Sequence, residues 1–155
     1  MVPNDHHTPT RHLLNAMVFD GVFERHPRLV LVLAESFTAW MPPLVHEMDK
    51  RLTKVAADGQ AQGNFYRLPL KPSEYVARQV KISPLIGVTE TGEFFSIPEL
   101  LERLPAPDML VYSSDFPHVE GRRDAVTAYN KHLPDDPAVR DAFYGGAMAD
   151  VLALN

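Results

Sequence analysis

The feature that most limits the fold of this chain is an unbroken apolar run, Leu29 to Ala34, which directly follows Pro27 and Arg28. A strand with one wet face alternates apolar and polar residues, whereas a strand covered on both faces is apolar throughout. Glu35 ends the run. The segment therefore predicts a strand of a parallel α/β sheet, buried on both faces, with an acidic side chain at its carboxyl end.

Helical periodicity flanks this strand on both sides. Before it, apolar residues at helical spacing predict a helix over 11–26, which Thr10 can cap and Pro27 ends. After it, Ser36 or Thr38 can cap a helix that holds two prolines in its first turn, where backbone N–H groups lack helical partners anyway. The predicted buried face of this second helix is Leu44, Val45, Met48, Leu52 and Val55.

The rest of the chain continues this alternation after a polar excursion over 57–72. The predicted elements are a helix over 73–78, a strand over 80–86, a helix over 96–104, a strand over 109–114, and helices over 122–132, from 136 and over 147–154. Pro84 shortens the second strand because it has no N–H for the ladder. Ser96 and Glu99 form the capping-box pattern that starts the third of these elements.

The predicted fold class is thus α/β, with about three parallel strands and flanking helices connected by right-handed crossovers. The length of 155 residues and a hydrophobic content of 45% suit one domain with a core, so residues 1–155 are interpreted as a single domain. Three strands leave two unpaired parallel edges, which associate readily with other chains. Either another chain completes the sheet or the architecture is unusual.

Composition excludes several function classes. The net charge is -5 and the lysines and arginines are scattered, so no basic stripe is available for nucleic acid. No apolar run is long enough for a membrane span, and the first residues lack a signal-peptide pattern, which predicts a cytoplasmic protein. The chain has no cysteine, so any metal site must use histidines and carboxylates.

The segment that carries a candidate site runs from Leu110 to Gly121. It is an apolar strand that ends in Ser113, Ser114 and Asp115, followed by a loop containing Pro117 and His118. In parallel α/β folds the carboxyl ends of strands are where chemistry takes place, which favours a metal-binding carboxylate. Two serines and an acid before a loop also suit turn and capping chemistry, so both interpretations stand on these residues alone.

Three segments together resemble the C-terminal part of the amidohydrolase-related family of metal-dependent (β/α)8-barrel enzymes, which includes aminocarboxymuconate-semialdehyde decarboxylase and the resorcylate-type decarboxylases. The segments are 21–29 with 32–35 and 40–42, then 113–121 with its Ser-Asp-Phe-Pro-His sequence, and 143–146 with its Gly-Gly pair. They match in order and spacing over nearly the whole chain. The resemblance implies a partial (β/α)8 TIM barrel made of its C-terminal βα units.

The resemblance also implies site residues. Asp115 takes the position of the metal ligand on the last strand, and Glu35 and His118 line the catalytic site. The implied cofactor is a divalent metal ion, zinc or manganese. The alternative that this chain alone holds no metal stands, because the family's His-x-His ligand pair is missing from the sequence. His6 and His7 would fall in a loop before the first helix, where terminal histidines are usually solvated.

Two functions follow. In the first, the chain belongs to a metal-dependent hydrolase or non-oxidative decarboxylase that acts on a small organic acid or cyclic substrate. In the second, it is a catalytically silent, truncated or split half-barrel that serves as an interaction module. The expected partners are a small-molecule substrate and either a second copy of the chain or a complementary N-terminal barrel fragment, with no nucleic acid and no membrane.

Overall fold

The computed structural model of the chain describes residues 8–57, 68–84, 96–118 and 121–153. The elements in the first half are α1 (Thr8–Phe19), α2 (Val22–Arg25), β1 (Leu31–Leu33), α3 (Met41–Ala57), α4 (Pro72–Gln79) and β2 (Val80–Ile82). Those in the second half are α6 (Ile97–Arg103), η1 (Pro107–Met109), α7 (Ala125–Asn130), α8 (Pro137–Asp141), η2 (Ala142–Gly146) and α9 (Ala147–Leu152). Helices therefore alternate with short strands, as predicted.

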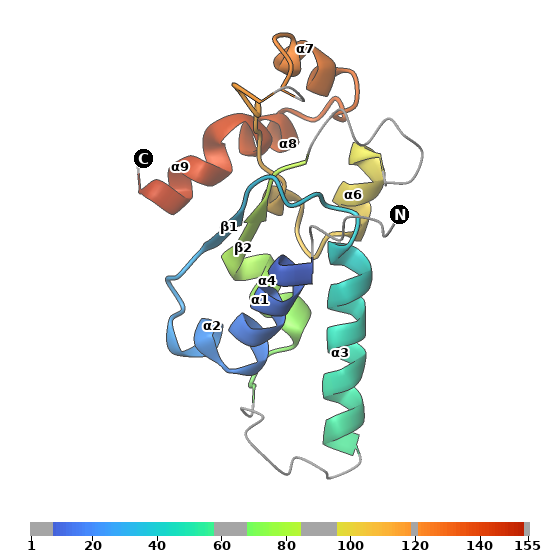
Figure 1. The fold of residues 1–155 in the computed structure, drawn as a ribbon, viewed down its shortest axis with the longest axis vertical. Coiled ribbons are helices and arrows are strands. Elements are labelled where there is room, and N and C mark those ends of the chain that lie inside the picture. The colour runs from blue at the N-terminus through green and yellow to red at the C-terminus, as the bar shows by residue number, and fades with distance from the viewer. Residues whose placement is uncertain (1–7, 58–67, 85–95, 119–120, 154–155) are drawn as a thin grey trace.

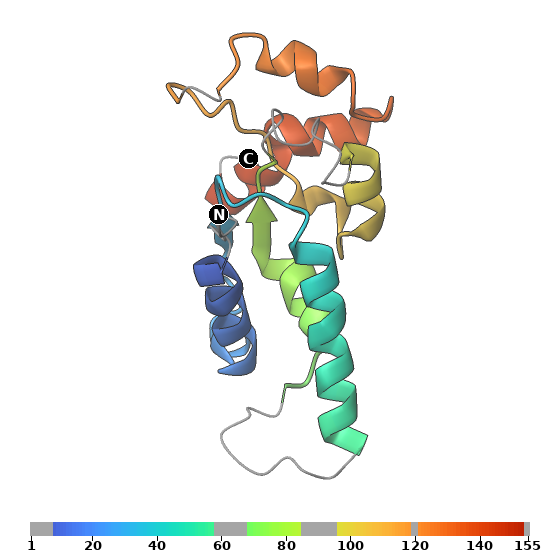
Figure 2. The same ribbon diagram turned by 45° about the vertical axis from the view of Figure 1, so that its right-hand side comes forward.

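The sheet lies between two groups of helices. Figures 1 and 2 show α1, α2, α3 and α4 toward one end of the molecule and the C-terminal helices α7, α8 and α9 toward the other. Strand β2 points toward the second group (Figure 2). The carboxyl ends of the strands, where the sequence places its acidic residues, therefore face the C-terminal third of the chain.

Strands β1 and β2 pair in parallel, with Leu31 opposite Val80 and Leu33 opposite Ile82. The predicted third strand over 109–114 is wrong as a full strand: its start is the 3-10 turn η1, and it joins β2 through a single parallel bridge between Ile82 and Leu110. The N–H of Val111 still donates to the carbonyl of Ile82 at 3.0 Å. The next N–H on this edge of β2 would belong to Pro84, which has none, so the ladder ends there.

The two faces of the sheet differ in cover, and the prediction that the first strand is buried on both faces is wrong in this structure. Leu33 packs in the core beneath the helices, whereas the neighbouring Val32 is 42% exposed on the opposite face. Because side chains alternate along a strand, Lys81 lies on the same face as Val32. Among the described residues no second layer covers Val32, whereas Lys81 is 6% exposed and pairs with Asp108 at 2.6 Å, so this face is open at β1 but covered at β2.

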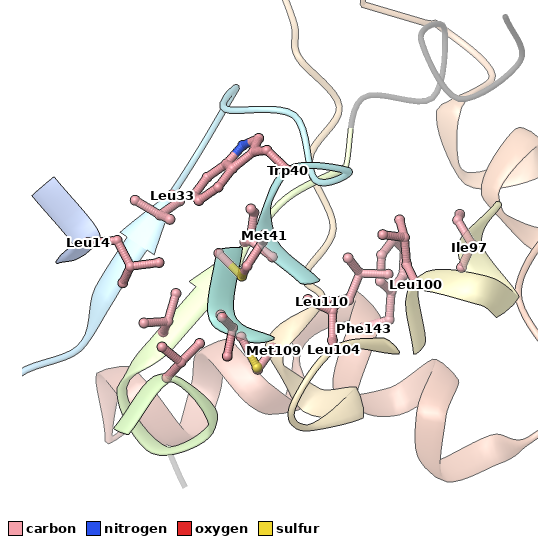
Figure 3. Close-up of a cluster of buried hydrophobic side chains, with 14 of the residues drawn as sticks. Leu14, Leu33, Trp40, Met41, Ile97, Leu100, Leu104, Met109, Leu110 and Phe143 are labelled. Carbon is pink, nitrogen blue, oxygen red and sulfur yellow. The ribbon is translucent and has the colours of Figure 1, made fainter. Parts of the chain in front are cut away.

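The core is one continuous cluster beneath the covered face (Figure 3). It links β1 through Leu33, the start of α3 through Met41, helix α6 through Leu100, and η2 through Phe143. Trp40 belongs to this cluster, with 8% exposure and its Nε1 donating to the carbonyl of Ser36 at 2.6 Å. Its role is core packing, as the patterning of the sequence favours for an aromatic residue at a helix start.

The predicted helix over 11–26 is divided in two. Gly21 adopts a left-handed conformation with φ of 69° between α1 and α2, which ends the first helix at Phe19. Glycine adopts this conformation without a Cβ penalty, so the chain turns here and starts a second helix. The apolar spacing in the sequence does not reveal this turn, because it continues from one helix into the next. Helix α3 begins at Met41 with Pro42 and Pro43 in its first turn, as predicted.

The later helices follow the prediction closely. Ser96 and Glu99 form the reciprocal capping box of α6, and Asp136 caps α8 through the N–H groups of Ala138 and Val139. The last helix, predicted over 147–154, ends at Leu152, and a π-turn (η2) that contains both glycines leads into it. The end of the predicted second strand, from residue 85, and most of the predicted 57–72 excursion lie outside the described residues.

A buried polar network closes the amino-terminal end of the sheet. Gln79 is fully buried, and its Nε2 donates to the carbonyls of His26 and Leu29, both at 2.9 Å. Its Oε1 accepts two hydrogen bonds from Arg78, at 2.7 and 3.0 Å. Every polar atom of this amide therefore has a partner, and the loop before β1 is tied to the end of α4.

Candidate metal site

The candidate site lies where three parallel segments end. Glu35 follows β1, Ser83 follows β2, and Asp115 follows the segment that bridges to β2. The strand order places Ser83 between the two acids along the sheet edge. Carboxyl ends of parallel strands meet at one edge, so residues 80 positions apart in sequence come together here.

Both acids have a left-handed backbone. The φ angle is 54° at Glu35 and 57° at Asp115, a conformation that costs a residue with a Cβ roughly 1–2 kcal/mol. In each case a serine hydroxyl accepts the N–H of the acid: Ser83 Oγ for Glu35 and Ser113 Oγ for Asp115, both at 3.4 Å. Strained residues of this kind concentrate at functional sites, where the surrounding structure fixes an unusual side-chain direction.

A tight turn brings His118 back over Asp115. The N–H of His118 donates to the carbonyl of Asp115 at 2.8 Å, and the N–H of Gly121 donates to the carbonyl of His118 at 3.1 Å. The peptide bond between Phe116 and Pro117 is cis. A Cβ on Gly121 would lie 2.6 Å from the carbonyl oxygen of Asp115, so only glycine allows the loop to approach this closely.

The three side chains converge on one point. His118 Nδ1 lies 3.1 Å from Asp115 Oδ1 and 3.5 Å from Glu35 Oε1. One ligand atom from each residue lies within 4.8 Å of the other two. The Asp115 side chain is 7% exposed, whereas those of Glu35 and His118 are 50% and 54% exposed. One acid is thus buried, and its two neighbours are open to solvent.

Asp115 Oδ1 is buried and makes no hydrogen bond among the described residues, although His118 Nδ1 is close to it. A buried carboxylate oxygen without a hydrogen bond is costly, so native structures rarely keep one without a reason such as a missing ion. Carboxylate oxygens and an imidazole nitrogen are ligands that zinc and manganese accept. The residues present therefore fit a divalent metal ion, with Asp115 as its buried ligand.

An aromatic cluster supports the site from the covered side. Tyr112, Tyr129, Phe143 and Tyr144 have ring centroids 5.0 to 6.1 Å apart, and Tyr112 N–H donates to the carbonyl of Phe143 at 2.9 Å. Tyr129 donates its hydroxyl to the carbonyl of Pro84 at 2.7 Å. Burial raises the pKa of Tyr129, and the charges of Tyr112 and Asp115 raise it further. The hydroxyl therefore stays protonated and holds the loop after β2 in place.

Other histidines and charged residues of the described chain lie away from this cluster. His46 and Glu47 lie on the exposed surface of α3, and Lys50 at the next helical turn pairs with Glu47 at 3.3 Å. Arg122 pairs with Asp124 at a helix start, at 3.0 and 3.1 Å. His6 and His7 lie outside the described residues.

None of the described helices is long and apolar enough to cross a membrane.

Sequence reasoning found the three converging residues but missed the ones that hold them. Ser83 was part of a predicted strand and Ser113 part of another, and neither was assigned a role in fixing an acid. The signal that could have found them is positional, because each serine lies at the point where its strand ends. Gly121 carried a signal too, since a glycine after a loop often marks a close backbone approach.

Comparisons with known proteins identify the family and the fold of the chain. Residues 2–154 match the profile of a protein family described as Amidohydrolase. An amidohydrolase structure from Mycobacterium avium subsp. paratuberculosis K-10 is 28% identical, with a TM-score of 0.70, over 96% of this chain and 34% of that one. The 5-carboxyvanillate decarboxylase LigW from Sphingomonas paucimobilis is 23% identical, with a TM-score of 0.65, over 93% and 39%. No curated protein sequence matches the chain.

A third structure carries a metal. The 5-carboxyvanillate decarboxylase LigW2 from Novosphingobium aromaticivorans, 16% identical with a TM-score of 0.66, holds manganese and 3-methoxy-4-hydroxy-5-nitrobenzoic acid, and covers 92% of this chain and 38% of its own. The chain thus spans between a third and two fifths of the length of the solved proteins it matches. The predicted fold, part of a TIM barrel, is confirmed by these matches.

Proposed function

The chain belongs to the amidohydrolase family, and from this premise we propose that it forms the C-terminal portion of a metal-dependent hydrolase or non-oxidative decarboxylase. The observation that carries the proposal is the buried Asp115 Oδ1, which has no hydrogen bond and lies at the carboxyl end of a parallel segment. We propose Asp115 as a metal ligand and Glu35 and His118 as residues that face the substrate. We also propose that residues 1–155 act as one domain.

The roles follow from burial and position. Asp115 is shielded from water, as suits a ligand, and Ser113 fixes its backbone. A bound divalent ion would polarise a substrate oxygen and lower the pKa of water toward 7. Glu35 and His118 are about half exposed, so a substrate can reach both. Phe116, which is 86% exposed in the same loop, offers an apolar contact to a ring.

The proposed substrate is a small organic acid with a ring. Two of the solved relatives are 5-carboxyvanillate decarboxylases, and one of them holds a nitrobenzoic acid together with manganese. Zinc and manganese both suit carboxylate and imidazole ligands. The proposal covers both metals and both reaction types.

The test combines metal analysis with assays for carbon dioxide release from carboxylated phenols and for hydrolysis of cyclic amides and esters. We expect metal content near one per chain in the wild-type protein after loading with manganese or zinc, and loss of most of it in Asp115→Asn. Glu102→Gln, an exposed glutamate on α6, serves as the control. Equal metal content in wild type and Asp115→Asn would overturn the role of Asp115 and the proposal with it.

A second candidate function is an interaction module. The exposed side of β1 favours it, because Val32 is 42% exposed and β1 pairs with one strand alone within the described residues. In this case the chain joins a complementary N-terminal barrel portion or a second copy through that edge. Sedimentation velocity should show that the wild-type chain self-associates and that Val32→Lys does not; a monomeric wild type would contradict the pairing of two copies.

A further inference from the structure

We propose that this chain supplies three ligands to a single divalent metal ion: the carboxylates of Glu35 and Asp115 and the imidazole Nδ1 of His118. The proposal rests on the proposed function in taking Asp115 as a ligand. It goes further because Glu35 and His118 become ligands rather than residues that face the substrate. They come from separate segments, the end of β1 and the turn after the last parallel segment.

The distances suit one ion. Ligand atoms about 2.0 to 2.2 Å from a metal lie about 3 Å apart in neighbouring positions and about 4 Å apart in opposite ones. His118 Nδ1 lies 3.1 Å from Asp115 Oδ1 and 3.5 Å from Glu35 Oε1, and all three ligand atoms lie within 4.8 Å of one another. The side chains need to move little for an ion to sit between them.

The buried oxygen is an independent observation. Asp115 Oδ1 lies 3.1 Å from a ring nitrogen yet makes no hydrogen bond, and its side chain is 7% exposed. An ordinary structural carboxylate at this depth would accept hydrogen bonds, as buried polar groups almost always do. The 3.1 Å between Asp115 Oδ1 and His118 Nδ1 is the separation that two ligands of one cation would have.

The backbone holds the ligands in advance. Glu35 and Asp115 both adopt left-handed conformations, and Ser83 and Ser113 accept their N–H groups. Pre-organised ligands lose less conformational entropy when an ion binds. Two carboxylates and one imidazole are ligands typical of manganese and zinc. Three protein ligands also leave coordination positions open for water and substrate, as catalytic metal sites do.

The experiment is a titration of the full chain with Mn²⁺, followed by the free-ion electron paramagnetic resonance signal and by calorimetry. We expect one bound Mn²⁺ per chain in the wild type, and at least tenfold weaker binding in each of Glu35→Gln, His118→Gln and Asp115→Asn. The matched controls are Glu102→Gln on α6 and His26→Gln before β1, both exposed and neither part of the three-residue cluster. These should bind within twofold of wild type, and circular dichroism verifies that each variant is folded.

The outcomes separate this inference from the proposed function. If Glu35→Gln and His118→Gln bind like wild type while Asp115→Asn does not, the three-ligand site is overturned and the role of Asp115 stands. If Asp115→Asn also binds like wild type, both fail. If the wild-type chain takes up no Mn²⁺ at millimolar concentration, the three-ligand site is overturned, because the chain would then need ligands from elsewhere.

Discussion

Two polar clusters lie at opposite ends of the same short sheet, and they are built in opposite ways. At the amino-terminal end every polar atom of the Gln79 amide is hydrogen-bonded, and Tyr75 donates to Glu24 Oε2 at 2.6 Å. At the carboxyl end, two acids with left-handed backbones converge on His118, and Asp115 Oδ1 has no hydrogen bond. One cluster is complete by itself, and the other needs a ligand.

This difference separates a structural role from a functional one. A fully satisfied buried network adds to stability and specifies one arrangement of the chain. A cluster of like charges with strained backbone and an unsatisfied oxygen costs stability, and natural proteins retain such features chiefly at functional sites. Substitutions at the amino-terminal end should therefore change stability, and substitutions at the carboxyl end should change ligand binding.

The largest expected effect is on stability and comes from Gln79→Leu. The substitution introduces an apolar residue of similar size, so the Leu29 carbonyl loses its side-chain donor and the Arg78 guanidinium loses its acceptor, while the His26 carbonyl keeps the Leu29 N–H. We expect the free energy of unfolding to fall by about 2–4 kcal/mol, because each buried unsatisfied group costs about 1–3 kcal/mol. Urea denaturation measures it, with Glu102→Gln as the control. A loss below about 0.5 kcal/mol would show that the network is not a main stabilising element.

Gly121→Ala should have the next largest effect, and it should change both the free energy of unfolding and the affinity for Mn²⁺. The new Cβ would approach the Asp115 carbonyl to 2.6 Å, so the loop must move away from the acid. We expect a loss of about 1–3 kcal/mol of unfolding free energy, the usual cost of overpacking, together with weaker Mn²⁺ binding. Gly145→Ala is the matched control, because a Cβ there meets no atom within 4 Å. Unchanged Mn²⁺ affinity in Gly121→Ala would indicate that the loop does not set the site geometry.

The network at the amino-terminal end of the sheet should also make the free energy of unfolding depend on pH in alkaline solution. Burial, together with the hydrogen bond to Glu24, raises the pKa of Tyr75 to about 12. The unfolded state loses this proton near pH 10 and the folded state near pH 12, so the free energy of unfolding should fall between these values, by at most about 1.4 kcal/mol per pH unit. Tyr75→Phe should flatten the decline. If the free energy of unfolding falls equally with pH in the wild type and in Tyr75→Phe, Tyr75 is not the group whose raised pKa causes the decline.

At the carboxyl end of the sheet we expect a smaller effect, in which a substitution raises the free energy of unfolding. Asp115→Asn removes a buried charge that lacks a hydrogen bond, so the metal-free protein should gain up to about 1 kcal/mol of unfolding free energy. Asp49→Asn is the contrasting variant: Asp49 Oδ1 accepts the N–H of Ser73 at 2.9 Å, so replacing this charged acceptor with a neutral one should destabilise. Chemical denaturation without metal tests both. Destabilisation by Asp115→Asn would mean that the buried carboxylate is a structural group.

The smallest effect is expected for Ser83→Ala. Its hydroxyl accepts the Glu35 N–H at 3.4 Å, a long contact, so its removal should cost about 0.5 kcal/mol of unfolding free energy. We expect Mn²⁺ binding to weaken several-fold, because Glu35 becomes less fixed. Ser73→Ala, on α4 at the other end of the sheet, should leave Mn²⁺ affinity unchanged. Equal affinities in all three proteins would remove Ser83 from the site.

The sequence predicted helices better than strands, for a physical reason. A capping box such as Ser96 with Glu99 is a local signal, and the predicted helix forms where expected. A strand depends on neighbours that local sequence does not show. The segment after Met109 reads as a strand, yet Pro84 on the neighbouring strand ends the ladder after one bridge. Likewise, burial of Val32 depends on a layer that the described residues do not supply.

The site was accessible to sequence reasoning in its acids but not in its geometry. Glu35 and Asp115 each end an apolar run, which is a local pattern. Their left-handed backbones and their serine acceptors depend on how three segments meet, and no local pattern encodes that. The convergence of His118 on both acids depends on a turn that Gly121 permits by close approach.

The central claim is that the carboxyl-end cluster needs an ion and the amino-end network does not. The most direct test is the free energy of unfolding with and without Mn²⁺ for wild type, Asp115→Asn and Tyr75→Phe. At a hundredfold excess over the dissociation constant, Mn²⁺ should add about 2.7 kcal/mol to wild type and to Tyr75→Phe, and almost nothing to Asp115→Asn. An equal gain in Asp115→Asn would contradict the claim.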